Sequence, residues 1–291
     1  MQTHGYPEEA QAALIHCYSA LEKAPEGHAF FALVSAYEQD KLIGYGDALK
    51  QVRACAKSVS QHPYVAELLF FLCLTRHAKQ RYMEKGISLR IYEDSMADLA
   101  YKLEECMLVY GIPGTFVGDW FPRFFELTRF ALGRLQFEIE PFRHSYENKE
   151  KNFVLGPESR VINVHIPRSG APLDREACRA SYREAAAFFA EDADAIAFVC
   201  HSWLLYPAHA SMLAEQSRIR LFASDYELLE WRDDPGNEDL WRLFDCLYDG
   251  NPDHLPGNTS LRRAYIDRLR AGQATGWGYG LYVPGVNRAS L

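Results

Sequence analysis

The stretch that decides the fold is VINVHIPRSGAP, residues 161–172, together with the helical pattern that follows over 174–189. Apolar and polar side chains alternate over Val161–Ile166, which is typical of a half-buried strand. The segment after it contains proline and glycine and ends the strand, and the apolar run Ala195–Val199 indicates a second one. A strand, a loop, a helix and a strand in this order predict two parallel neighbours in one sheet.

Further strands and helices are predicted on both sides of this strand–helix–strand segment. Leu135, Phe137 and Ile139 alternate with polar residues, which predicts a strand before it. After it we expect, in chain order, a short helix at 208–216, a strand at 220–222, a helix from the capping Thr259 to Arg270, and a strand at 276–283. Bare glycines occupy one face of that last strand, which marks close approach of another backbone or a ligand, or a loosely packed terminal strand.

Residues before Gly133 follow a helical period instead. Apolar stripes at helical spacing begin at Leu14 and at Leu49, and the segments 64–80, 94–110 and 119–132 show the same pattern with Gly and Pro between them. We therefore predict a helical domain over 1–132 and an α/β or α+β domain, with a mixed sheet flanked by helices, over 133–291.

Composition narrows the class of protein. With 48% hydrophobic and 24% charged residues the chain should fold into globular domains, and a net charge of −8 without a Lys/Arg run argues against nucleic acid as a partner. The first residues lack the features of an export signal, and the longest apolar run, Val65–Leu74, is too short for a bilayer. The 7 scattered cysteines and the absence of His-Glu-x-x-His favour reduced thiols, a cytoplasmic location, no membrane and no metal.

The motifs at 162–170 (INVHIPRSG), 200–207 (CHSWLLYP), 255–256 and 259–263 (TSLRR) resemble a family of bacterial proteins. Members of this family pair an N-acyltransferase N-terminal domain with a GNAT-like C-terminal domain. The resemblance covers most of the chain. It implies transfer of an acyl group from acyl-CoA or acetyl-CoA to an amine acceptor, either a small molecule or a peptide.

The resemblance also implies where the acyl-CoA lies. The cofactor would occupy a wedge between the strands that end near Ile166 and Val199, with its pyrophosphate at the start of the helix between them. The implied cofactor-binding residues are Arg168, Ser169, Gly170, Ala171, Arg175 and Arg179. The loop is shorter than the usual pattern of Gln or Arg, two residues, Gly, one residue, and Gly or Ala. Because Asp174 is placed to cap the helix itself, a self-capped structural turn is the alternative.

Acyl transfer to an amine needs a base for the amine proton and an acid for the leaving thiolate. Glu138 and Glu140 share one strand face, and Asn163 and His165 share a face of the next strand, so antiparallel pairing would bring the four together. We predict Glu138 or His165 as the base and Tyr206 as the acid. The alternatives are that the strand residues face solvent and that Tyr206 is a packing residue with a wet hydroxyl.

Two other readings of the sequence stay open. Cys200-His201-Ser202 suggests a hydrolase nucleophile, although adjacent strand residues point to opposite faces and no Gly-x-Ser-x-Gly elbow is present. A non-catalytic module of the same fold would bind an acyl-CoA, a nucleotide or a protein partner. The helix-spaced aromatic residues of the segment 119–132 are expected in a core between the two halves or in an acyl-chain pocket, and they are Trp120, Phe121, Phe124 and Phe125.

Overall fold

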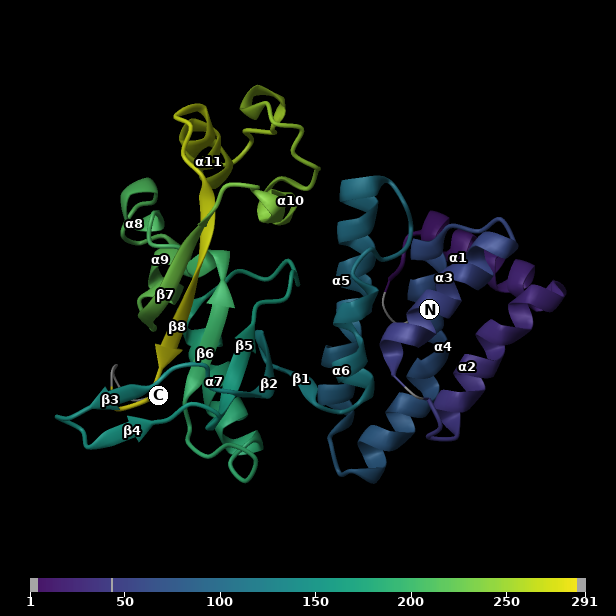
Figure 1. Ribbon diagram of the computed structural model, residues 1–291, viewed down its shortest axis with the longest axis horizontal. Helices are drawn as coiled ribbons and strands as arrows, with labels where there is room; N and C mark the ends of the chain where they lie inside the picture. Colours follow the sequence, from purple (N-terminus) through teal and green to yellow (C-terminus); the bar gives the residue numbers. More distant parts are fainter. Residues whose placement is uncertain (1–4, 43, 287–291) are drawn as a thin grey trace. The chain divides into compact units, whose positions relative to one another are not determined.

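The computed structural model describes residues 5–42 and 44–286 (Figure 1). The chain divides into two compact units, Met1–Phe130 and Ala131–Leu291. The first unit is helical and the second is a mixed sheet flanked by helices, which confirms the predicted fold class.

The first unit is built on its two longest helices. Its helices are α1 (Glu8–Lys23), α2 (His28–Glu38), α3 (Tyr45–Ser58), α4 (Pro63–Glu84), α5 (Leu89–Tyr110) and the short α6 (Pro122–Phe125). The Ser88 hydroxyl caps the start of α5, and Gly111 ends the helix in the left-handed conformation. Phe70, Phe71 and Leu74 of α4 are fully buried in the core of this unit.

The prediction of one helix over 119–132 is wrong. Pro122 starts α6, but the helix ends after one turn and Leu127 takes a positive φ of 59°. The next residues form strand β1 (Arg129–Leu132). A two-residue turn then begins at Gly133, whose φ of 70° is readily adopted only by glycine, and leads into β2 (Leu135–Pro141).

Three of the four aromatic residues predicted in this segment, Phe121, Phe124 and Phe125, are buried in the core of the first unit, and Trp120 is only partly buried. The rings of Phe121 and Phe125 lie 4.9 and 5.2 Å from that of Phe71. Phe124 is also buried. Their helical spacing identified core residues, and the core is that of the helical unit itself.

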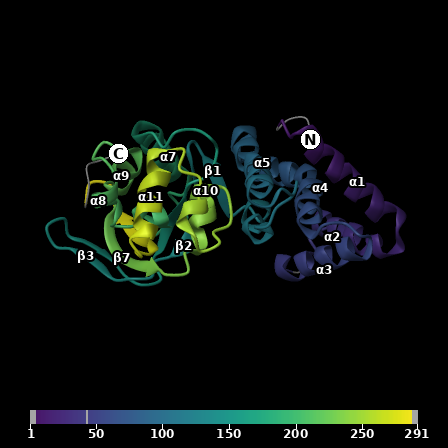
Figure 2. The same cartoon turned by 90° about the horizontal axis from the view of Figure 1, so that it is seen from above.

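The second unit contains a six-stranded sheet in the order β1-β2-β5-β6-β8-β7 (Figures 1 and 2). Strands β5 and β6 are parallel, and the pairs β2–β5, β6–β8 and β7–β8 are antiparallel. A separate hairpin is formed by β3 and β4. The bounds are β3 (Tyr146–Asn148), β4 (Phe153–Leu155), β5 (Arg160–His165), β6 (Phe198–Ser202), β7 (Glu227–Asp234) and β8 (Thr275–Tyr282).

Helix α7 (Arg175–Phe188) connects β5 to β6, as the sequence predicted, and covers one face of the sheet. The ring of Tyr182 lies 6.3 Å from Phe137, 5.0 Å from Phe198 and 5.1 Å from Tyr282. We call this the α7 face. Figure 2 shows α7 and the β3–β4 hairpin on opposite sides of the sheet.

The opposite face, here the hairpin face, is apolar only in part. Tyr146 and Leu155 of the hairpin pack with Val161, Val199 and Leu281. The residues that continue the same face toward the carboxyl ends of β5 and β6 are polar. These polar residues form the site described below.

Two short elements differ from their predictions. Residues 220–222, predicted as a strand, belong to helix α9 (Arg218–Ala223), because the Ser217 hydroxyl accepts a hydrogen bond from the amide of Arg220 and caps it. Three residues are too few to distinguish a strand period from a helical one. The predicted helix at 208–216 is only the single turn α8 (His209–Met212). The helix at 259–270 is confirmed as α11 (Ser260–Arg270) with Thr259 as its cap.

The glycine face of β8 is explained by close approach of other backbone. A Cβ at Gly278 would lie 2.5 Å from the carbonyl oxygen of Leu205, and one at Gly276 would lie 2.4 Å from that of Arg232. The segment that follows β6 therefore packs directly on the β8 backbone.

We expect Gly278→Ala to destabilise the second unit by at least about 2 kcal/mol, because the methyl group has no room and the backbone must shift. Urea unfolding followed by fluorescence measures the change. The control is Gly257→Ala, where the added methyl meets only ordinary contacts of 3.5 Å. Equal midpoints for the two variants would contradict the close packing.

A buried histidine holds three elements of the second unit together. His209 is only 2% exposed. Its Nε2 lies 2.6 Å from the Tyr265 hydroxyl of α11, and its Nδ1 lies 3.3 Å from the carbonyl oxygen of Leu204. The carbonyl can only accept, so Nδ1 donates and Nε2 accepts from Tyr265. Burial lowers the pKa of His209 to about 4.

We expect His209 to make the protein sensitive to acid. Its pKa in the folded state is below the unfolded value of about 6.5, so protonation favours unfolding and stability falls as the pH drops through this interval. The linkage predicts a loss of about 2 kcal/mol between pH 7 and pH 4.5. Urea unfolding at both pH values should show this loss in the native sequence and a smaller one in His209→Gln. An equal loss of stability in both proteins would show that His209 does not cause the acid sensitivity.

Candidate functional site

The two parallel strands part after two residue pairs. Among the described residues, β5 and β6 are in register only at Ile162–Phe198 and Asn163–Val199. Strand β5 continues to His165, whereas β6 stays paired with β8 as far as Ser202 and Gly278. The carboxyl ends of β5 and β6 therefore diverge, at the place where the family resemblance implies a wedge.

The predicted polar side chains converge beside this opening. Glu138 of β2 is in register with Asn163 of β5, and the two strands are antiparallel. His165 Nε2 lies 2.7 Å from Glu138 Oε1. The side-chain amide nitrogen of Asn163 donates to Glu140 at 2.8 Å and lies 3.4 Å from His165 Nε2. Of the three predicted catalytic residues, Glu138 and His165 are thus brought together.

The burial of this group differs from that of solvent-facing strand residues. The Glu138 side chain is 4% exposed and that of His165 is 19% exposed. A buried carboxylate that contacts an imidazole fixes the orientation of the ring and stabilises its protonated form. The arrangement can therefore take up a proton at His165.

A buried acceptor lies beside this pair. Asn163 is 7% exposed, and its Oδ1 is buried without a hydrogen-bond partner in the described chain. The amide orientation follows from Glu140, because a carboxylate only accepts and must face the amide nitrogen. Since a buried unpaired oxygen is costly, this atom marks a place where a ligand or a water with an N–H or O–H group fits.

Tyr206 lies elsewhere. Its hydroxyl donates to Asp233, and Arg268 donates to the same hydroxyl at 2.8 Å. Its ring lies against Gly276 on the α7 face, whereas Glu138 and His165 lie on the hairpin face. Burial and Asp233 raise the pKa of Tyr206. The structure does not bring Tyr206 to the other two predicted residues, and its contacts favour the packing role.

Two of the predicted phosphate ligands are paired with carboxylates. Arg168 donates to Asp245, which also accepts from Arg262 of α11. Arg175 donates to Asp225 at 2.8 Å. These guanidinium groups connect the loop after β5 and the start of α7 to the carboxyl-terminal part of the unit.

Asp174 caps α7, as the alternative reading anticipated. Its Oδ1 accepts from the amides of Glu176 and Ala177 at 3.0 and 3.2 Å. These two amides are thereby removed from any phosphate site at the helix start.

Several donors of the predicted loop remain. Within the described chain no hydrogen bond uses the amides of Ser169, Gly170 or Ala171, and the guanidinium group of Arg179 in α7 makes neither a hydrogen bond nor an ion pair. Gly170 has a φ of 73° and open space where a side chain would be. Backbone amides and one arginine are therefore left to meet an anion.

Sequence reasoning missed the residue that shapes this loop. Arg134, in the turn between β1 and β2, donates to the carbonyl oxygens of Pro167 at 3.1 Å and Pro172 at 3.2 Å. The two carbonyls flank the loop, so Arg134 fixes its width. Nothing in the sequence near Arg134 indicates a partner more than thirty positions away.

His201 was considered in the sequence analysis only as part of a hydrolase alternative. It lies on the hairpin face next to the last residue of β6, with its ring 4.1 Å from that of Trp277. Burial and the nearby Arg143 lower the pKa of His201. Cys200 points to the other face and is fully buried, and the Ser202 hydroxyl accepts from the amide of Leu204 at 3.1 Å. The three residues do not form a hydrolase arrangement.

The described residues contain no helix that is long and apolar enough to cross a membrane. Within the same residues no group of three or more His, Cys, Asp or Glu side chains is placed to hold a metal ion. All seven cysteines are free thiols.

The family follows from the two halves of the chain. Residues 129–282 match the model of a GNAT-like C-terminal domain, and residues 1–127 match that of an N-acyltransferase N-terminal domain. The chain belongs to this two-domain N-acyltransferase family. The resemblance inferred from the sequence motifs is thereby confirmed. The sequence matches none of the curated proteins.

Solved acyltransferase structures share the fold. One, in complex with decanoyl-CoA and teicoplanin, has 22% identity and a TM-score of 0.67 over 88% of this chain and 76% of that chain. Another, in complex with decanoyl-CoA, has 22% identity and a TM-score of 0.68 over 95% of this chain and 88% of that chain. A third, in complex with CoA and 10C-teicoplanin, has 22% identity and a TM-score of 0.67 over 89% and 76%.

We expect Asp245→Asn to loosen the loop after β5, because Arg168 and Arg262 both lose a charged partner. Although burial acts against it, the two guanidinium groups lower the pKa of Asp245, so the carboxylate is charged at neutral pH. Asparagine tolerates the positive φ of this position. Amide hydrogen exchange over residues 166–172 should become faster by at least about threefold. The control is Asp253→Asn. Unchanged amide exchange in both variants would contradict the view that Asp245 holds the loop in place through Arg168 and Arg262.

Proposed function

We propose that the protein is an acyl-CoA-dependent N-acyltransferase that moves an acyl group from a CoA thioester to an amine. The observation that carries the proposal is the contact between Glu138 and His165 beside the parted ends of β5 and β6. Family membership supports it, as does the shared fold with acyltransferases crystallised with decanoyl-CoA and with CoA.

The cofactor would bind between β5 and β6. The amides of Ser169, Gly170 and Ala171, together with Arg179, suit its pyrophosphate, since amide donors and a guanidinium favour phosphate oxygens. In this proposal Arg168 and Arg175 act through their carboxylate partners and hold the loop and the helix start in place.

The chemistry follows from the polar cluster. His165 takes the proton of the acceptor amine, and Glu138 stabilises the imidazolium that results. Asn163 Oδ1 is suited to accept an N–H of the same amine, which explains an otherwise unpaired buried oxygen. The amine nitrogen bonds to the thioester carbon, the carbon–sulfur bond breaks, and the proton held by His165 is available to the CoA thiolate.

The acceptor is proposed to be a small molecule or a peptide with a primary amine. One of the related structures holds teicoplanin next to decanoyl-CoA. The seven free thiols suit a reducing compartment, and we propose the cytoplasm.

A non-catalytic acyl-CoA-binding module of the same fold is the second candidate. It is favoured by the cap that Asp174 places on α7, because this cap competes with a phosphate for the helix amides. The two candidates differ in whether the thioester is consumed.

We expect Glu138→Gln and His165→Ala to lower kcat/KM for acyl transfer by about 10²–10⁴, the usual contribution of a general base. Thiol release from acetyl-CoA, octanoyl-CoA and decanoyl-CoA in the presence of a panel of primary amines measures the rate. Binding of CoA, followed by calorimetry, should stay unchanged in both variants. The matched control is Glu147→Gln on the exposed part of β3.

Each result decides a different part of the proposal. If both variants transfer the acyl group at the native rate, neither Glu138 nor His165 is the general base. Binding of acyl-CoA without thiol release for any amine would favour the non-catalytic module. No binding of any acyl-CoA at millimolar concentration would overturn both candidates.

A further inference from the structure

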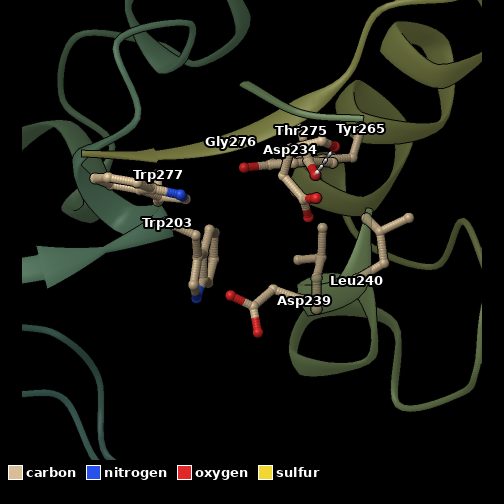
Figure 3. A pocket seen from close by; sticks show the side chains of 9 residues that line it. Trp203, Asp234, Asp239, Leu240, Tyr265, Thr275, Gly276 and Trp277 are labelled. Carbon is tan, nitrogen blue, oxygen red and sulfur yellow. Dashed lines mark hydrogen bonds between the residues drawn. The ribbon is translucent and has the colours of Figure 1, made fainter. Parts of the chain in front are cut away.

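A small cavity lies beyond the carboxyl end of β6. Its volume is about 20 Å³, and it lies between the start of β8, the turn Glu238–Leu240, α10 (Trp241–Phe244) and α11. Figure 3 shows Trp203 and Trp277 on one side and Leu240 on the other, with Asp234 and Asp239 beside the space between them.

The size and the lining of the cavity favour a small cationic group. A volume of about 20 Å³ accommodates roughly one water-sized group. A primary ammonium is of that size, and indole rings and carboxylates both attract it. Arg232 already lies 5.8 Å from the centre of the Trp277 ring, so this indole has one cation against it in the protein itself.

Both carboxylates keep one oxygen available. Asp234 Oδ2 accepts from the amide of Glu238 at 2.8 Å, and Asp239 Oδ1 accepts from Arg242 Nε at 2.7 Å. Within the described residues no hydrogen bond falls on Asp234 Oδ1 or Asp239 Oδ2. A cation in this cavity would contact the two carboxylates and the indole rings of Trp203 and Trp277.

The cavity adjoins the candidate site. Trp277, which lines it, contacts His201 at 4.1 Å between ring centres. Asp239 acts electrostatically on the same histidine. His165 ends β5 and lies on the same sheet face, with β6 between it and β8. Two strand spacings amount to about 10 Å, and β5 and β6 diverge at this end, so an extended acceptor longer than this is able to reach both places.

We propose that this cavity binds a second ammonium group of the acceptor, so that the acceptor carries two amines separated by more than about 10 Å. One amine reaches His165 and is acylated, and the other is held by Trp203, Trp277, Asp234 and Asp239. This inference rests on the proposed function for its acylation step, but the binding of the ammonium does not depend on it.

The test compares octamethylenediamine with octylamine, which has the same chain and one amine. Calorimetry on the full-length protein should show that the diamine binds and that Asp239→Asn weakens it by about tenfold, while Asp239→Lys abolishes binding. Asp192→Asn removes the same charge at the amino end of β6 and serves as the control. Octylamine should bind more weakly than the diamine, because its single amine occupies only one of the two places.

Kinetics provide an independent readout. With the diamine as acceptor, Asp239→Asn should raise KM by a larger factor than it lowers kcat. Equal affinity of the native protein and Asp239→Lys for the diamine would overturn the inference, whether or not acyl transfer occurs. Binding that depends on Asp239 in a protein without transferase activity would overturn the proposed function and leave the ammonium site intact.

Discussion

The structure of the second unit depends on the short parallel contact between β5 and β6. Two residue pairs hold the strands together, and beyond them each strand follows a different neighbour. Strand β6 stays paired with β8 along its length. The glycines of β8 let the segment after β6 pack directly against the β8 backbone. Parting the strands leaves backbone groups of both without a sheet partner, and such groups favour a ligand that hydrogen-bonds to them.

The same divergence decides which side chains meet. Because β2 pairs with β5 in antiparallel register, every second residue of both strands points to the hairpin face, and five of these are polar. Burying Glu138 is unfavourable unless it is paired, and His165 supplies the partner at 2.7 Å. The pair lies beside the apolar part of this face, and Glu138 is less exposed than His165.

The sequence predicted what depends on local periodicity. The alternation in 135–140 and 161–166 established two strands, and their antiparallel pairing brought Glu138 to His165. Local periodicity does not predict contacts between segments that are distant in the sequence. Tyr206 follows the second strand of the wedge, but the direction of its side chain is set by Asp233 and Arg268, far along the chain. The strand at Arg129–Leu132 was hidden in an apparently helical segment, because the turn at Gly133 ends a strand as readily as a helix.

The arginines near the loop show why residue type alone does not define a phosphate site. Arg168 and Arg262 share the carboxylate of Asp245, and Arg175 is neutralised by Asp225. The charge that remains beside the loop comes from the second guanidinium on Asp245, and Arg179 lies farther along α7. A pyrophosphate here would therefore depend mainly on backbone amides, whose positions Arg134 fixes through Pro167 and Pro172. Amide donors in a fixed loop lose little freedom on binding, whereas a long cationic side chain must be ordered. The shortened, proline-bearing loop is consistent with binding through the backbone.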